Sequence, residues 1–201
     1  TTNEVHPGER HFYRMPLRGG KREQLSNGEG NHQAVLSPND QHVASLYSTA
    51  NQPWELYLGT TGEAAAQITN SQTDDWKAYP WRKPELVTFE AADGATVYAR
   101  LYRPEILVDQ GPAVVFVHGA GYLQNAHKWW SSYFREYMFH NLLADKGYTV
   151  LDIDYRGSMG YGRDWRTGIY RLMGGKDLSD QVDGAQFLVD NYGIAPDRLG
   201  I

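Results

Sequence analysis

The sequence contains no cysteine, no long hydrophobic run and no excess of positive charge. Without cysteine, disulfide bonds and thiolate metal sites are excluded. No apolar stretch approaches the ~18 residues that a membrane-spanning helix needs, so no membrane span is expected. The formal net charge of -5 provides no basic surface for nucleic acid or for anionic lipid, and neither is expected as a partner.

The first ten residues, TTNEVHPGER, also lack the features of a secretory leader. They contain neither a basic segment nor an apolar core, and no initiator methionine precedes them. We therefore interpret either end as a cut in a longer protein. The compartment stays open: a soluble protein of the cytoplasm, or of the periplasm or exterior, is consistent with this composition.

Sequence motifs for bound metals and cofactors are missing as well. The seven histidines show no His-Glu-x-x-His or similar ligand spacing, so no metal site is expected. Neither a phosphate-binding G-x-x-x-x-G-K-[ST] nor a G-x-G-x-x-G pattern occurs, and no cofactor is expected.

Residues 1–80 alternate short β-type runs with turn residues. The stretch WELYLGTTGEAAAQIT echoes FYRMPLRGGKREQLS, with Ile68 and Leu25 in matching places. Their separation of about 43 residues lies in the range of four-stranded propeller blades. This pattern predicts the C-terminal part of a β-propeller, although a plain antiparallel meander fits it too. The segment 73–85, which carries two prolines, is interpreted as a linker.

Residues 81–201 follow a different pattern, which predicts an α/β fold. Asp93-Gly94 indicates a hairpin turn between two alternating strands. The apolar runs 113–117 and 148–153 predict adjacent parallel strands, buried on both faces and joined by a helix over 130–146. RLGI at the end of the chain predicts a further parallel strand.

A second helix is predicted within DLSDQVDGAQFLVDNYG. Asp177 is the expected N-cap, Asp180 adds negative charge to the first turn, and Gly193 ends the helix. Helical spacing predicts that five residues form its buried stripe, namely Leu178, Val182, Ala185, Leu188 and Tyr192.

Two glycine-containing motifs are candidates for chemistry. RGSMG (156–160) approaches the nucleophile pattern G-x-S-x-G, but Arg156 crowds the tight turn and Ser158 stands five residues beyond the strand. We expect a glycine-rich surface loop there and no catalytic role for Ser158. HGAGY (118–122) directly follows a buried strand, where backbone N–H groups can form an oxyanion hole. The alternative, that His118 merely caps the strand end, stays open.

Three stretches in this order resemble the prolyl oligopeptidase family of serine peptidases: VVFVHGAGYLQNAHKWW, LDIDYRGSMGYGRDW and GGKDLSDQVDGAQFLVDNYGIAPDRLGI. The branch resembles dipeptidyl peptidase IV and acylaminoacyl peptidase. The resemblance implies the last blades of a β-propeller (1–80), followed by the N-terminal half of an α/β-hydrolase domain with a mainly parallel sheet and flanking helices (81–201). A peptide is the implied substrate.

The family's Ser-Asp-His triad is expected beyond residue 201, with the serine in an elbow just after the last strand. No triad residue is expected in this chain, and His118 comes too early to be the base. The oxyanion-loop candidates are Gly119, Ala120, Gly121 and Tyr122. Some members place a tyrosine hydroxyl in the hole, and the matching position resembles Ala120, which points to a backbone N–H. An esterase, a pseudoenzyme or a noncatalytic scaffold fragment are the alternatives.

Overall fold

The computed structural model describes residues 1–120 and 122–201, and the chain divides into two compact units. The first unit comprises Thr1–Trp81 together with His127–Trp130. The second comprises Arg82–Ala126 and Ser131–Ile201. No helix of the described chain is long and apolar enough to cross a membrane.

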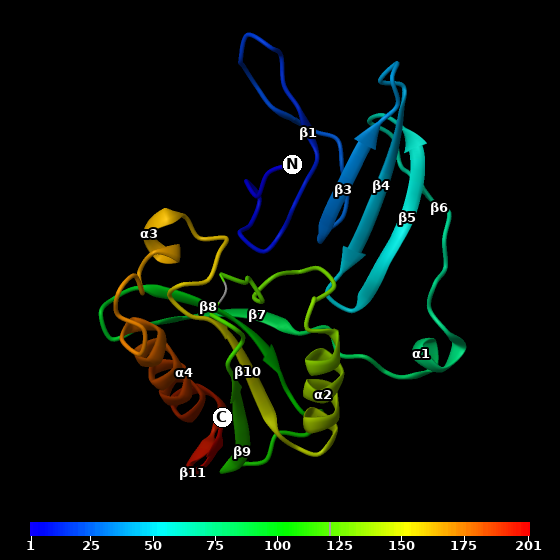
Figure 1. The fold of residues 1–201 in the computed structure, drawn as a ribbon. Coiled ribbons are helices and arrows are strands. Elements are labelled where there is room, and N and C mark those ends of the chain that lie inside the picture. Colours follow the sequence, from blue (N-terminus) through cyan, green and yellow to red (C-terminus); the bar gives the residue numbers. More distant parts are fainter. Residues whose placement is uncertain (121) are drawn as a thin grey trace. The chain divides into compact units, whose positions relative to one another are not determined.

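Antiparallel strands make up the first unit (Figure 1). One sheet has the order β3-β4-β5-β6, and a separate hairpin pairs β1 with β2. The turn at Pro38-Asn39-Asp40 joins β3 to β4, and Asp40 takes the left-handed conformation that aspartate tolerates. The bounds are β1 (Tyr13–Arg14), β2 (Glu23–Gln24), β3 (Asn31–Leu36), β4 (His42–Thr49), β5 (Gln52–Thr60) and β6 (Ala66–Gln67).

The hairpins β1–β2 and β5–β6 repeat the same cross-strand pair. Tyr13 lies opposite Gln24 and donates its hydroxyl to Gln24 Oε1 at 3.0 Å. Tyr57 lies opposite Gln67 and donates to Gln67 Oε1 at 3.1 Å. The sequence echo thus corresponds to one structural unit used twice.

The chain leaving each hairpin repeats as well. The Phe12 N–H donates to Ser26 Oγ at 3.0 Å, and the Leu56 N–H donates to Thr69 Oγ1 at 2.8 Å. A hydroxyl residue two positions after the glutamine therefore closes both copies in the same way. Matching hydrogen bonds at matching positions support a structural repeat more strongly than the sequence similarity alone.

The segment 73–85 holds the short helix α1 (Asp74–Ala78), capped by the Thr73 hydroxyl, which accepts from the Trp76 N–H at 3.2 Å. The Trp76 ring stacks on Trp81 at 4.0 Å and meets Trp130 edge-on at 5.2 Å. Trp130 also donates its N–H to Ser48 Oγ at 3.2 Å. These contacts hold Trp130 in the first unit, so the helix predicted over 130–146 begins later than expected.

A five-stranded sheet of order β11-β9-β10-β8-β7 forms the second unit (Figure 1). β10 runs parallel to β9, as the sequence predicted, and β11 also pairs in parallel with β9. β8 pairs antiparallel with both β10 and β7, so the parallel part is limited to three strands. The bounds are β7 (Glu85–Glu90), β8 (Thr96–Tyr102), β9 (Gly111–Phe116), β10 (Thr149–Asp154) and β11 (Ile194–Gly200).

Three helices accompany this sheet: α2 (Phe134–Asp145), α3 (Arg163–Arg166) and α4 (Lys176–Tyr192). His140 of α2 packs against Tyr102 and Phe116, whereas Gly184 of α4 faces Leu151 and Ile153 of β10. Tyr102 and Phe116 pair with Val150 and Asp152 of β10, so all four side chains point to one face of the sheet. Leu151 and Ile153 alternate with them and point to the other face. Helices α2 and α4 therefore cover opposite faces of the sheet. Every residue of β10 is accordingly buried.

Helix α4 buries only part of the predicted stripe: Leu188 is fully buried, and Ala185 and Tyr192 pack partly buried against the core. Leu178 and Val182 are 55% and 60% exposed, and the buried residues are Asp180, Gln181, Gly184 and Leu188. Gly184 allows the helix to approach the sheet closely, and Asp180 is buried because it pairs with Arg156. The expected N-cap at Asp177 is also wrong, because Gly175 precedes the first turn. Gly193 ends the helix in the left-handed conformation, as predicted.

Candidate functional site: the loop after strand β9

The loop 118–126 leaves the sheet at the carboxyl end of β9. The strands β9 and β10 are neighbours, yet the helices that follow them cover opposite faces. The connections that follow β9 and β10 therefore diverge at the carboxyl ends of these strands. In open α/β sheets, ligands bind in the crevice that forms where neighbouring connections diverge in this way. Gly119, Ala120 and Tyr122 are all exposed there. Gly121, the remaining oxyanion candidate, lies outside the described residues.

The backbone donors of this loop are not equivalent. The Gly119 N–H donates to the Tyr133 hydroxyl at 3.0 Å, so its hydrogen-bonding capacity is already used. The Ala120 N–H makes no hydrogen bond to any other residue of the described chain. An exposed N–H without a protein partner is available to a bound group, so Ala120 is the better donor of the two.

Tyr122 differs from its neighbours because its backbone is left-handed, with φ of 61°. A bulky residue rarely takes this conformation without support. The Arg166 guanidinium lies over its ring at 4.8 Å, a cation–π contact that supplies such support. Tyr122, Met159 and Arg166 line an open depression on the same surface. Aromatic and cationic groups thus border the loop.

His118 begins the loop with its side chain buried, at 2% exposure. Its Nε2 lies 3.2 Å from Asp154 Oδ1 and 3.2 Å from Ser158 Oγ, while its Nδ1 lies 3.1 Å from the Gly119 carbonyl oxygen. Burial lowers the pKa of His118, but hydrogen bonding to Asp154 and that residue's negative charge outweigh burial and raise it overall. The doubly protonated imidazolium fits this site, because both nitrogens then donate.

Ser158 lies beside this histidine but is not arranged as a nucleophile. In a catalytic triad the histidine uses one ring nitrogen for the serine and the other for the aspartate. Here Asp154 and Ser158 share Nε2, and a protonated Nε2 cannot accept the serine proton. Ser158 is also completely buried, as are Arg156 and Gly157, whereas Met159 is 43% exposed, so the expected surface loop at 156–160 is wrong for its first three residues. Two residues of the RGSMG motif are held inside by hydrogen bonds: Ser158 to His118 of the loop 118–126, and the Arg156 N–H to Asp180 of helix α4.

The carboxylate of Asp154, at the end of β10, collects donors from several elements. The N–H groups of Asn125 and Ala126 donate to it at 2.6 and 3.0 Å, and the Tyr161 hydroxyl donates at 2.6 Å. Sequence reasoning missed this cluster. A usable signal was present, because an aspartate in an otherwise apolar buried strand has to find partners.

Asp152 precedes Asp154 on the same face of β10 and is also buried. Burial raises the pKa of its carboxyl group to about 6, although the Arg100 charge and the hydrogen bond from Asn125 act in the opposite direction. The Asn125 amide nitrogen lies 2.9 and 3.1 Å from its two oxygens. Asn125 thus joins the two aspartates of β10 to the end of the loop.

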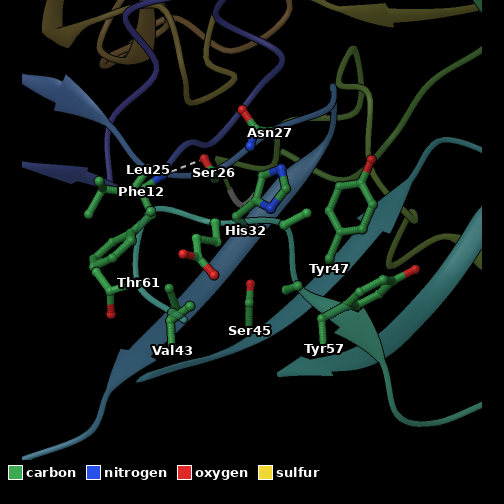
Figure 2. A pocket seen from close by; sticks show the side chains of 15 residues that line it. Phe12, Leu25, Ser26, Asn27, His32, Val43, Ser45, Tyr47, Tyr57 and Thr61 are labelled. Atoms are coloured by element: carbon green, nitrogen blue, oxygen red, sulfur yellow. Dashed lines mark hydrogen bonds between the residues drawn. The ribbon is translucent and has the colours of Figure 1, made fainter. Parts of the chain in front are cut away.

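In the part of the chain that the structure describes, no group of three or more His, Asp or Glu side chains is placed to hold a metal ion. A separate cavity of about 190 Å³ lies in the first unit (Figure 2). His32 stacks on Tyr47 in its wall at 4.3 Å, and burial lowers the pKa of His32. Ligand pockets usually exceed ~300 Å³, so this volume suits packing space better than a binding site.

Two family models match separate stretches of the chain. The prolyl oligopeptidase family matches residues 134–201, and the dipeptidyl peptidase IV (DPP IV) N-terminal region matches residues 1–54. An uncharacterized peptidase, YuxL, from Bacillus subtilis is 30% identical over 169 residues, which are 83% of this chain and 25% of that protein. Human dipeptidyl peptidase 8 is 29% identical over 207 residues, or 97% of this chain and 23% of that protein.

The crystal structure of Porphyromonas gingivalis dipeptidyl peptidase 4 superimposes with a TM-score of 0.82 at 22% identity, covering 99% of this chain and 28% of that one. This likeness shows the fold, which combines propeller-type and α/β-hydrolase parts. The chain spans about a quarter of the length of the curated relatives it matches. The two family models, these relatives and the shared fold together identify the chain as a member of the prolyl oligopeptidase family.

Proposed function

We propose that this chain is part of a serine peptidase that hydrolyses short peptides through an acyl-enzyme. Residues 1–80 form the C-terminal part of its β-propeller, and residues 81–201 form the N-terminal half of its α/β-hydrolase domain. The repeated Tyr–Gln hairpins support the first assignment. The parallel pairing of β11, β9 and β10, in this order across the sheet, supports the second assignment.

The observation that carries the proposal is the position of Ala120. Ala120 is exposed at the carboxyl end of a central parallel strand, and its N–H has no partner among the described residues. In acyl transfer, a backbone N–H at this position stabilises the negative charge that develops on the carbonyl oxygen. Gly119 and Tyr122 border this donor and shape the loop around it. The nucleophile, acid and base of the triad belong to sequence beyond residue 201.

The test compares the 201-residue chain with a longer protein that contains it and continues past Ile201. A fluorophosphonate probe should label one serine of the longer protein and leave the 201-residue chain unlabelled. The longer protein should also release p-nitroaniline from dipeptide p-nitroanilides or from N-acetylated aminoacyl p-nitroanilides. Hydrolysis of esters without hydrolysis of peptide amides would favour an esterase, and a longer protein without labelling or activity would show a noncatalytic member.

Labelling of the 201-residue chain itself would contradict the exclusion of Ser158. The Ser158→Ala variant identifies that outcome, since only labelling at Ser158 disappears with it. A product comparison between free and N-acetylated peptides then distinguishes dipeptidyl from acylaminoacyl specificity.

A further inference from the structure

Both ends of loop 118–126 converge on the same buried carboxylate. At the start of the loop, the His118 ring reaches Asp154 Oδ1 through Nε2 at 3.2 Å. At its end, the N–H groups of Asn125 and Ala126 donate to the two Asp154 oxygens. Asp154 has no exposed surface, so water does not compete for these bonds.

The chain that follows Asp154 contacts the loop between its two ends. The Tyr155 hydroxyl donates to the His118 carbonyl oxygen at 2.7 Å, and the Met159 N–H donates to the Leu123 carbonyl oxygen at 3.1 Å. Gly160 has φ of 105°, which favours glycine, and a Cβ atom there would lie 2.5 Å from the end of the Gln124 side chain. Residues 154–161 therefore act as a support for loop 118–126.

The exposed residues of the loop lie between these anchors. Gly119, Ala120 and Tyr122 reach the surface, whereas His118, Asn125 and Ala126 are buried. A backbone donor contributes most to an oxyanion hole when it is held in place before the charge develops. The anchors meet this requirement by fixing where the exposed segment begins and ends.

We propose that Asp154 is a positioning residue: by binding His118 at one end of the loop and Asn125 and Ala126 at the other, it fixes the exposed backbone donor at Ala120. This inference rests on the proposed peptidase function for its effect on catalysis. Its structural half, the fastening of the loop, stands without that function. The two halves are therefore tested by separate measurements.

The informative substitution is Asp154→Asn, which keeps the size of the side chain. An asparagine has one acceptor oxygen in place of two and adds an NH2 group that can only donate. At least one of the Asn125 and Ala126 N–H groups then loses its acceptor. The matched control is Asp183→Asn, because Asp183 also accepts a backbone N–H, from Ala92 at 2.9 Å, and lies outside the loop and its support.

The first measurement is hydrogen exchange on the 201-residue chain. In Asp154→Asn, amides in the peptide 118–126 should exchange at least about 10-fold faster, while those of β9 and β10 keep their protection. Asp183→Asn should leave the loop unchanged. Unaltered exchange of the loop in a folded Asp154→Asn variant would overturn the proposal, whether or not the longer protein is a peptidase.

The second measurement is kinetic and uses the longer protein, with active sites counted by fluorophosphonate titration. Asp154→Asn should lower kcat per titrated site by about 10- to 100-fold, less than the ~10²–10³ lost with a complete oxyanion donor, and should change KM less than about threefold. A purely structural role would reduce the number of active sites and leave kcat per site unchanged, and that result would overturn the catalytic half.

If wild-type longer protein is inactive, the proposed function fails, and the exchange result still decides the fastening of the loop. If Asp154→Asn does not fold, Tyr161→Phe replaces it, since this variant removes one donor to Asp154 and keeps the ring. Tyr161→Phe should speed exchange of the loop about threefold or more and lower kcat per site in the same direction. No change in either quantity would contradict the proposal.

Discussion

The guanidinium of Arg156 lies against the carboxylate of Asp180, with Nε 3.0 Å from both carboxylate oxygens. Asp180 also accepts the backbone N–H of Arg156 at 2.7 Å, and both residues are buried. This pair joins the chain after β10 to the first turns of α4. Arg156 additionally forms an ion pair with Asp93 at the hairpin between β7 and β8, so three elements meet at one side chain.

Replacing Arg156 with methionine should destabilise the chain more than replacing Asp180 with leucine. Without Arg156, Asp180 stays buried with no cation beside it, which typically costs ~3–5 kcal/mol of unfolding free energy. Without Asp180, Arg156 still has the half-exposed Asp93 as a partner. Urea denaturation of both single variants and of the double variant measures these costs. The double variant should lose less than the sum, and strict additivity would show that the two side chains act independently.

Adding a methyl group at Gly184 of helix α4 should lower the stability of the chain. A Cβ atom there would lie 2.3 Å from Ile153 Cδ1 and 3.1 Å from Phe89 Cζ. Overpacking costs ~1–3 kcal/mol, and the ~1 kcal/mol by which alanine favours a helix over glycine offsets only part of it. Gly184→Ala should therefore lower the unfolding free energy by roughly 1 kcal/mol.

The cause of that loss can be separated by shortening the opposing side chain. Ile153→Val removes the Cδ1 atom that the new methyl group would meet. The double variant Gly184→Ala/Ile153→Val should then be more stable than the sum of the two single effects predicts. If both single losses add without recovery, the close contact at Gly184 is not the source of the destabilisation.

His140 should make the chain less stable in acid. Burial, and secondarily the charge of Arg100, lower the pKa of His140 to about 4, below its ordinary value of 6.5. Its Nδ1 has no hydrogen-bond partner within the described chain, so no acceptor there stabilises a proton on this nitrogen. The unfolded chain takes up a proton near pH 6.5, whereas the folded chain does so only near pH 4. The stability present above pH 6.5 is therefore lost as the pH falls towards 4, by on the order of 3 kcal/mol.

The comparison that isolates this effect is His140→Phe, which keeps a ring between Tyr102 and Phe116. Urea denaturation at pH 4, 5, 6 and 7 should show a smaller acid loss in the variant. Asp152 acts in the opposite direction, because its raised pKa of about 6 favours the folded state in acid, but both proteins contain it and its contribution cancels. Equal pH dependence in the two proteins would exclude His140 as the source.

Much of the second unit could be predicted from the sequence because its central strands β9 and β10 have no exposed residue. The apolar runs at 113–117 and 148–153 identify β9 and β10, and parallel pairing follows from the helix between them. Asp93-Gly94 locates the β7–β8 hairpin, where Gly94 has φ of 80°. These features are local and depend on the order of residue types along the chain.

Part of the buried face of α4 and the start of α2 could not be predicted in the same way. A hydrophobic stripe assumes that apolar side chains are inside, but Asp180 is inside because Arg156, distant in sequence, neutralises it. Trp130 fits the helical spacing of α2, yet Trp76 and Ser48 hold it in the first unit. In both cases a contact between remote residues outweighs the local pattern.

The same distinction between local pattern and remote contacts applies to the candidate site. The loop 118–122 could be singled out as a candidate because its glycines directly follow a buried strand, although a plain turn after the strand fits the same residues. Its anchors could not, since His118 lies 36 and 40 positions before Asp154 and Ser158 and meets them only in the folded chain. A buried carboxylate in an apolar strand indicates that a partner exists and leaves its identity undetermined.

The chemistry of Ala120 gives the most specific prediction for the longer protein. If its N–H stabilises the oxyanion, side-chain identity at this position matters little and the N–H matters greatly. Ala120→Gly should leave kcat within a few-fold, because the donor stays. Ala120→Pro removes the donor and should lower kcat by ~10²–10³, with the measurement made per titrated active site.

Proline at position 120 also has to be distinguished from a folding defect. Gly119 precedes it and carries no Cβ atom, so the usual clash between proline and the preceding side chain is reduced. Thermal melts of wild type, Ala120→Gly and Ala120→Pro should agree within a few degrees if the loop absorbs the change. A folded Ala120→Pro variant with near-normal kcat would exclude the Ala120 N–H as the donor. The Tyr122 hydroxyl would then be the next donor to test: in the Ala120→Pro background, Tyr122→Phe would abolish the remaining activity if that hydroxyl supplied the hydrogen bond, because phenylalanine keeps the ring over which Arg166 lies and removes only the O–H.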